Sequence, residues 1–197
     1  MGIYCHRSLF LGVIAVFSDA MLCFLSRDSI LAHIDYMKNL RHRYSIIEKS
    51  YPALSGKDIF SCKGRGLPRS VRDEAEGLMR EYLSHKLYFS SFAENLSPCQ
   101  KIRKFYPSED SFCYEVLTLA RKYDGGFIYI FSADGSSPRI LHSSDTPRVF
   151  ERDTPILALD LSEHAYFADY GFERDNYLKS AVARLDINKL FLPKDLT

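Results

Sequence analysis

The chain has 197 residues, which is enough for one or two domains. Hydrophobic residues make up 46% and charged residues 26%, so the composition excludes a disordered tail and a collagen-like chain. Lys+Arg (26) and Asp+Glu (25) leave a formal charge of +1. We therefore find no direct signal for nucleic acid, because no strong positive field draws the chain to a phosphate backbone.

The cysteines and the N-terminal residues bear on the cellular compartment. Five scattered cysteines form no C-x-x-C pair, which predicts a reducing compartment rather than a disulfide framework or a structural zinc site. Residues 9–17 form an apolar run after Arg7. The run is too short for a transmembrane helix, which needs about 20 residues, so we predict no transmembrane segment. A targeting role stays open, because a secretory apolar region has this length.

The first half of the chain is predicted to be helical. Ser26 or Asp28 caps a helix that continues towards Ile47, with apolar residues at helical spacing. Residues 61–69 carry two glycines and a proline, which predicts a loop. A second long helix is expected from about Val71 to Phe92.

The second half changes character. A helix over residues 112–123 leads to Gly125 and Gly126. Three β-rich runs follow, at residues 127–131, 139–142 and 155–160, with a hairpin signal at Asp134-Gly135. The remaining residues are expected to be helical. Helices followed by a short antiparallel sheet and more helices predict an α+β fold.

Two pairs of side chains suggest a metal site. They are Glu81-x-x-x-His85 in the second helix and Asp160-x-x-x-His164 after the third strand. Residues four apart share a helix face, so a carboxylate and an imidazole can point at one centre. Such mixed ligands suit iron, manganese or zinc. By spacing alone the alternative of a solvated helix face stays open, because Glu-x-x-x-His is a common pattern.

Longer motifs resemble one family. Residues 157–178, LALDLSEHAYFADYGFERDNYL, resemble the C-terminal signature of the iron/manganese superoxide dismutases, D-x-W-E-H-A-Y-Y followed by D-Y, Arg and Tyr. Within the core of that signature only Ser162 and Phe167 depart. The similarity covers roughly residues 15–190. It includes the D-A…S…H opening around His33, the H-T-x-F-W…A-P-N segment after His85 and the G-W-x-W strand at 126–129.

The resemblance implies a fold, a metal and an activity. The fold is an N-terminal helical hairpin domain (residues 1–97) and a C-terminal α/β domain (residues 98–197) with a three-stranded antiparallel sheet. One iron or manganese ion per chain is expected between them, and the implied activity is superoxide dismutation, an oxidoreductase reaction. The implied ligands are His33, His85, Asp160 and His164.

The sequence departs from the family around these ligands. The family's Gln that bonds metal-bound solvent corresponds to Glu81 or, from the other segment that supplies it, to Ser144. The gateway Tyr corresponds to Arg41. Glu81 and Arg41 are therefore the residues expected to modify catalysis. The family's dimer contacts correspond to Glu163, Met37 and Phe167, and they imply a homodimer or a heterodimer with a related dismutase-like chain.

Two functions remain open from the sequence. The first is a metal-binding dismutase whose activity the altered surroundings weaken. The alternative is a degenerate dismutase-like structural subunit of a large mitochondrial assembly, such as the small subunit of the mitochondrial ribosome, which would place the protein in mitochondria. The basic loop at residues 63–69 and the cluster Lys101, Arg103 and Lys104 would serve as contacts there. Arg174, at the family's Arg position, would attract an anion near the site.

Overall fold

The computed structural model describes residues 20–54, 59–62, 66–132 and 136–192. The apolar run at 9–17, the Asp134-Gly135 turn and positions 63–65 of the basic loop lie outside the described residues. None of the described helices combines the length and the apolarity that a membrane crossing requires.

Helix α2 (Arg27–Ser50) is the first long element, and its start is the predicted one. The Ser26 side chain accepts a hydrogen bond from the backbone N–H of Ser29 at 3.2 Å, which satisfies one of the free donors of the first turn. Residues at helical spacing face the interior, so the helix buries one stripe. They are Ile30, His33, Ile34, Met37, Leu40 and Tyr44.

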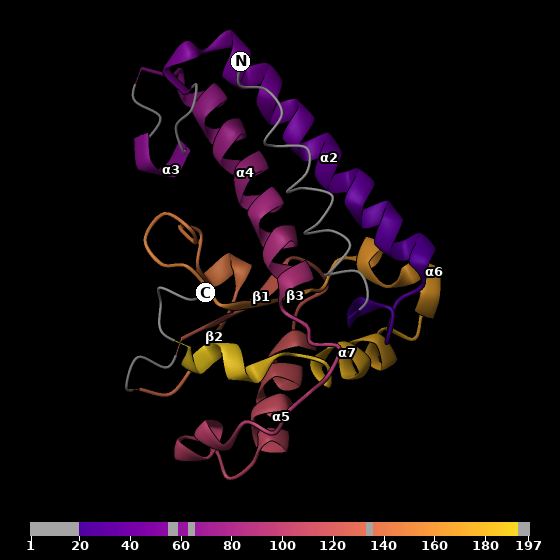
Figure 1. Cartoon of the computed structure of the whole chain (residues 1–197). Coiled ribbons are helices and arrows are strands. Elements are labelled where there is room, and N and C mark those ends of the chain that lie inside the picture. Colours follow the sequence, from indigo (N-terminus) through magenta and orange to yellow (C-terminus); the bar gives the residue numbers. More distant parts are fainter. Residues whose placement is uncertain (1–19, 55–58, 63–65, 133–135, 193–197) are drawn as a thin grey trace, which may run out of the picture.

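Helix α4 (Arg69–Ser90) packs along α2 to form a helical hairpin, with α3 (Ile59–Cys62) near its N-terminal end (Figure 1). The helix ends two residues before the predicted Phe92. Its last turn is closed by the Ser91 hydroxyl, which donates to the carbonyl of Leu87 at 2.8 Å. Phe92 instead forms a β-bridge with Leu185, so a tertiary contact decides where the helix stops.

Helix α5 (Glu109–Ala120) begins three residues earlier than predicted. The reason is the cap at Ser108, whose side chain accepts from the backbone N–H of Ser111 at 3.2 Å. The acidic residues Glu109 and Asp110 then occupy the first turn, where they complement the helix dipole.

The sheet is antiparallel, with strand order β2-β1-β3. The strands are β1 (Phe127–Phe131), β2 (Arg139–His142) and β3 (Leu157–Asp160). Strand β1 lies in the centre, and every residue of β1 and β3 is buried. The pairing of Phe127 with Asp160 brings the end of β3 beside the start of β1.

Short elements complete the C-terminal part. They are η3 (Ser143–Asp145), η4 (Glu163–Ala165), α6 (Phe167–Tyr170), α7 (Arg174–Val182) and η5 (Ile187–Phe191). Helix α7 packs against α5, and α6 lies beside the N-terminal end of α2 (Figure 1). The backbone N–H of Ser26 donates to Asp169 Oδ2 at 2.8 Å, and the Tyr170 hydroxyl donates to the carbonyl of Phe24 at 2.6 Å.

The main core runs from the hairpin into the sheet. It contains buried residues of α2, α4, α5, α7 and all three strands, and a smaller cluster around Tyr44 and Leu78 fills the far end of the hairpin. Helix α4 contacts β3 directly. The predicted α+β class, with a helical N-terminal region and a three-stranded antiparallel sheet, is confirmed. The division into domains at residues 97 and 98 stays a prediction.

Candidate metal centre

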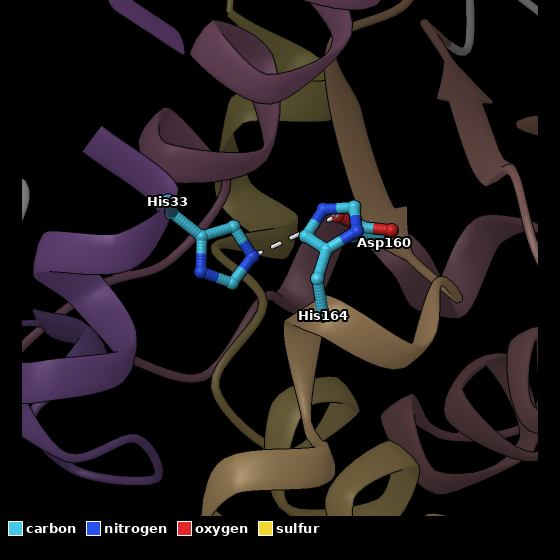
Figure 2. Close-up of side chains that lie close together, drawn as sticks. All are labelled: His33, Asp160 and His164. Carbon is cyan, nitrogen blue, oxygen red and sulfur yellow. Dashed lines mark ion pairs between the residues drawn. The ribbon is translucent and has the colours of Figure 1, made fainter. Parts of the chain in front are cut away.

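Four side chains from four elements converge where the hairpin meets the sheet. His33 comes from α2, His85 from α4, Asp160 from the end of β3 and His164 from η4. Asp160 Oδ2 lies 3.8 Å from the Nε2 of His33, 3.4 Å from that of His85 and 3.2 Å from that of His164. Figure 2 shows His33 facing Asp160 and His164 across the junction. All four predicted ligands are therefore brought together.

Backbone contacts fix which atom each side chain offers. The Nδ1 atoms of His33 and His85 lie 2.9 Å from the carbonyls of Ser29 and Glu81. A carbonyl only accepts, so Nδ1 carries the proton and Nε2 keeps its lone pair. Asp160 Oδ1 accepts from the backbone N–H of Ser162 at 2.9 Å, which leaves Oδ2 for the centre. Such supporting bonds are what orient metal ligands.

The converging atoms fit a metal ion. His33, His85 and Asp160 have fully buried side chains, whereas 40% of the His164 side chain is exposed. Among the described residues, His33 Nε2 and Asp160 Oδ2 are buried without a hydrogen-bond partner. A buried, unpaired polar atom is costly, and a bound cation would remove that cost. His33, Asp160 and His164 offer ligand atoms within 4.8 Å of one another, and His85 Nε2 lies 3.0 Å from His164 Nε2.

Electrostatics keep Asp160 charged. Burial by itself raises the pKa of the Asp160 carboxyl, but the neighbouring imidazoles of His164, His33 and His85 outweigh it and hold the pKa well below its usual range. Burial also opposes a charge on His85, yet Asp160 raises the pKa of that imidazole. The centre thus supplies one carboxylate and three imidazoles, a donor set that suits iron and manganese.

A buried pair of tyrosines holds the backbone of Asp160 in place. The Tyr177 hydroxyl donates to the Asp160 carbonyl at 2.8 Å, and the hydroxyl oxygens of Tyr88 and Tyr177 are 3.0 Å apart. Because Tyr177 has only one proton, Tyr88 must donate to it. Burial raises the pKa of Tyr177 well above its usual value, so the proton stays in place. Tyr177 belongs to the motif noted in the sequence, but its support of Asp160 could not be predicted from the motif.

Glu81 lies beside the centre, on the outer edge of His85. Its Oε1 is 3.7 Å from His85 Nδ1, the nitrogen that points away from Asp160. Burial raises the pKa of the Glu81 carboxyl, His85 lowers it, and Asp160 raises it further. Glu81 therefore reaches His85, and its predicted role in catalysis stays a prediction.

Arg41 and Ser144 are occupied elsewhere. The Arg41 guanidinium lies 3.6 Å from Glu48 Oε2 and sits over the ring of Tyr44, with a distance of 5.2 Å to the ring centroid. The Ser144 hydroxyl lies 2.8 Å from His142 Nδ1. The structure brings neither side chain to the four converging residues.

The residues predicted for a subunit interface differ in exposure. Glu163 is exposed and 48% of Phe167 is exposed, whereas Met37 is buried in the main core. Arg174 does not face the centre, because its guanidinium donates to the carbonyls of Ala120 and Tyr123 at the C-terminal end of α5.

Tyr36 is a neighbour of the centre that the sequence analysis missed. Its ring centroid lies 5.1 Å from that of His85 and 5.2 Å from that of His164. Burial, with the charges of Glu81 and Asp160, raises the pKa of its hydroxyl. The sequence spacing could have predicted this position, because Tyr36 follows His33 by three residues and therefore lies on the same face of the helix.

Comparison with known families bears on the C-terminal half. Residues 95–190 match the family described as iron/manganese superoxide dismutases, C-terminal domain. The matched segment contains the sheet together with Asp160 and His164.

Proposed function

Because this chain belongs to the iron/manganese superoxide dismutase family, we propose that it binds one iron or manganese ion through His33, His85, Asp160 and His164. The observation that carries the proposal is the pair of buried, unpartnered atoms, His33 Nε2 and Asp160 Oδ2, that face one point. When bound, the ion would supply the one-electron redox chemistry by which the family dismutates superoxide.

The side chains have separate tasks in this proposal. His33 and His85 present Nε2 because carbonyls hold their Nδ1 protons. Asp160 supplies the negative charge, and Tyr177 fixes its backbone. His164 forms the exposed rim, where a small anion would arrive.

We propose that dismutation by the native sequence is weak. Glu81 places a carboxyl where the family has a Gln, next to His85. A negative charge there would favour the oxidised metal and would repel superoxide. Arg41 gives no compensation at the centre, because Glu48 and Tyr44 hold its guanidinium.

A second proposal is a structural role in a large mitochondrial assembly. The observation that favours it is an exposed aromatic pair. Phe172 is 94% exposed, and its ring packs edge-on against Phe167 at 5.6 Å. A surface of this kind suits a protein partner. The partner would be a second copy, a related dismutase-like chain or a neighbour in the assembly.

Metal analysis of purified protein tests the first proposal. We expect about one iron or manganese ion per chain, and metal loading should raise the free energy of unfolding by about 3 kcal/mol at a hundredfold excess over Kd. His33→Ala and His164→Ala should each abolish binding. His42→Ala is the matched control, because His42 is an exposed histidine of the same helix as His33.

A wild-type protein that takes up no iron or manganese on refolding with either ion would contradict the proposal. So would metal content that survives both ligand substitutions.

A further inference from the structure

The aromatic neighbours of the centre differ in their exposure. Tyr88 and Phe89 lie against His33, with ring centroids 5.8 and 5.9 Å away, and Phe127 meets His85 edge-on at 5.1 Å. These three rings are buried, so they close the centre on its inner side. Tyr36 is the exception, because 40% of it is exposed while its ring packs on His85 and His164.

The two imidazoles under Tyr36 are not equally accessible. The His85 side chain is completely buried, whereas 40% of the His164 side chain is exposed. Tyr36 is therefore a half-exposed ring that packs on a fully buried ligand candidate, His85, and the His164 imidazole stacks on the same His85 ring at 5.3 Å. Its ring meets that of His85 at an interplanar angle of 57°.

Among the other described side chains of α2, His33 also packs on His85 and His164, but it is buried. Arg41 is held by Glu48 and Tyr44, and Met37 is buried in the core. Arg43 ends in an exposed ion pair with Glu74, at 3.5 Å. Tyr36 is thus the partly exposed side chain of α2 that packs on the imidazole of His85.

We propose that Tyr36 is the gate of the metal centre, and that its ring determines the size of the molecules that reach His85 and the atoms beside it. Small anions of two or three atoms reach the centre past the exposed side of His164, while larger reagents and chelators are excluded from it. The inference rests on the proposed function, since it concerns access to the same centre.

Access can be measured without any metal. The full chain is freed of metal by a chelator under denaturing conditions and refolded without metal. It is then treated with diethylpyrocarbonate, which modifies accessible imidazoles, and each histidine is followed by mass spectrometry. In the wild type we expect His164 to react and His85 to be protected. Tyr36→Ala should speed modification of His85 about tenfold or more, because a shielded group reacts only when its cover is away. The rate at His164 should change much less.

Two variants serve as controls. Tyr36→Phe keeps the ring and should keep His85 protected, which separates the ring from its hydroxyl. Tyr114→Ala removes an exposed tyrosine of α5 and should leave both rates unchanged. If circular dichroism shows that Tyr36→Ala does not fold, Tyr36→Val opens the same position with a residue that still packs.

Metal extraction gives the second readout. Loaded protein is mixed with excess ethylenediaminetetraacetate, and release is followed for the wild type and the same variants. Tyr36→Ala should release metal about tenfold faster, whereas Tyr36→Phe should follow the wild type.

The outcomes separate the two proposals. If the wild type binds metal and Tyr36→Ala changes neither His85 modification nor metal release, the proposal that Tyr36 is a gate is contradicted. The proposal that the four side chains bind a metal is not affected by that result. If Tyr36→Ala exposes His85 but no variant and no wild-type protein binds iron or manganese, the metal centre fails and the shielding by Tyr36 is upheld.

Discussion

Two carboxyl groups flank the imidazole of His85, one near each of its ring nitrogens. Asp160 Oδ2 is 3.4 Å from Nε2, and Glu81 Oε1 is 3.7 Å from Nδ1. Negative charge at both nitrogens makes the imidazole a stronger electron donor, which favours the higher oxidation state of a bound metal. The Glu81 side chain is 36% exposed, so it can be changed without opening a cavity in the core.

Replacing Glu81 by Gln is expected to raise dismutase activity. The change removes the charge beside His85 and the repulsion of superoxide, and we expect an increase of about tenfold, which corresponds to ~1.4 kcal/mol of barrier. Pulse radiolysis at neutral pH with metal-loaded protein measures it. Arg41→Tyr, alone or combined with Glu81→Gln, should add little, because its guanidinium contacts Glu48 and Tyr44 and not the centre.

Native activity at the level of an efficient dismutase would show that Glu81 does not impair the centre. An unchanged rate in Glu81→Gln with metal still bound would show instead that other departures dominate, such as Ser162 where the family has Trp.

Gly126 is required by its backbone conformation and its neighbours. Its φ is +74°, and an added Cβ would overlap Ser143 Oγ and lie 2.9 Å from His142 Nε2. Gly126→Ala should therefore cost about 3 kcal/mol of unfolding free energy, measured by urea unfolding. Gly77 in α4 is the control, because no atom lies within 4 Å of its added Cβ. Gly77→Ala should stabilise by about 1 kcal/mol, and similar effects at both positions would contradict the argument.

At the scale of elements, the start of α2 is tied to α6 by Asp169. The Asp169 carboxylate accepts from the backbone N–H of Ser26. Burial raises the pKa of Asp169, but the hydrogen bonds from Ser26 and Ser29 outweigh it and the net pKa is lowered. A lowered pKa in the folded state means that folding favours the carboxylate. The contribution to stability is complete above the ordinary value of 3.8 and is lost as the pH falls through the folded value.

Asp169→Asn should accordingly destabilise the protein by about 1 kcal/mol at neutral pH. The difference from the wild type should shrink as the pH falls below 3.8 and disappear below the folded-state pKa, where both proteins lack the charge. Urea unfolding at a series of pH values measures this. Asp35→Asn removes an exposed carboxylate of α2 that pairs with Lys38, and it should have little effect at any pH. A difference that stays constant with pH would rule out the charge of Asp169 as the cause.

Most elements could be predicted because their signals are local. Ser26 caps α2, and the β-rich runs form the three strands. The helix ends that differ from the prediction depend on contacts with other parts of the chain. Helix α4, for example, stops before Phe92 because Phe92 forms a β-bridge with Leu185. The four converging side chains were identified by resemblance, since no local spacing relates His33 to Asp160. The position of the Arg41 side chain could not be predicted from the sequence. A long side chain can reach several partners, and which of them it contacts depends on its rotamer.

At the scale of the whole molecule, the exposed aromatic pair lies close in sequence to the rim of the centre. Phe167 and Phe172 follow Glu163 and His164 within a short segment of chain. The family is typically oligomeric, and we propose that a second copy or a related chain covers this surface. In a symmetric dimer each such residue counts twice, once from each subunit.

Phe172→Asp should therefore weaken self-association by about a hundredfold, given about 1.5 kcal/mol for each buried phenylalanine. Sedimentation velocity over a range of concentrations measures it. Tyr114→Asp is the control, because Tyr114 is an exposed aromatic residue of α5, outside this segment. A wild type that is monomeric at high concentration, and that associates with no dismutase-like chain, would contradict the proposal.

The separation of the ligand candidates along the chain has a consequence for folding kinetics. His85 and His164 lie 79 positions apart in the sequence, and they meet only when the helical hairpin of α2 and α4 has docked on the sheet. Closing a long loop carries an entropic cost before any contact rewards it, so local helices and the β1-β2 hairpin should form first. The junction then assembles after the transition state. A bound ion would act mainly on the unfolding rate, and loaded protein should persist longer without folding faster.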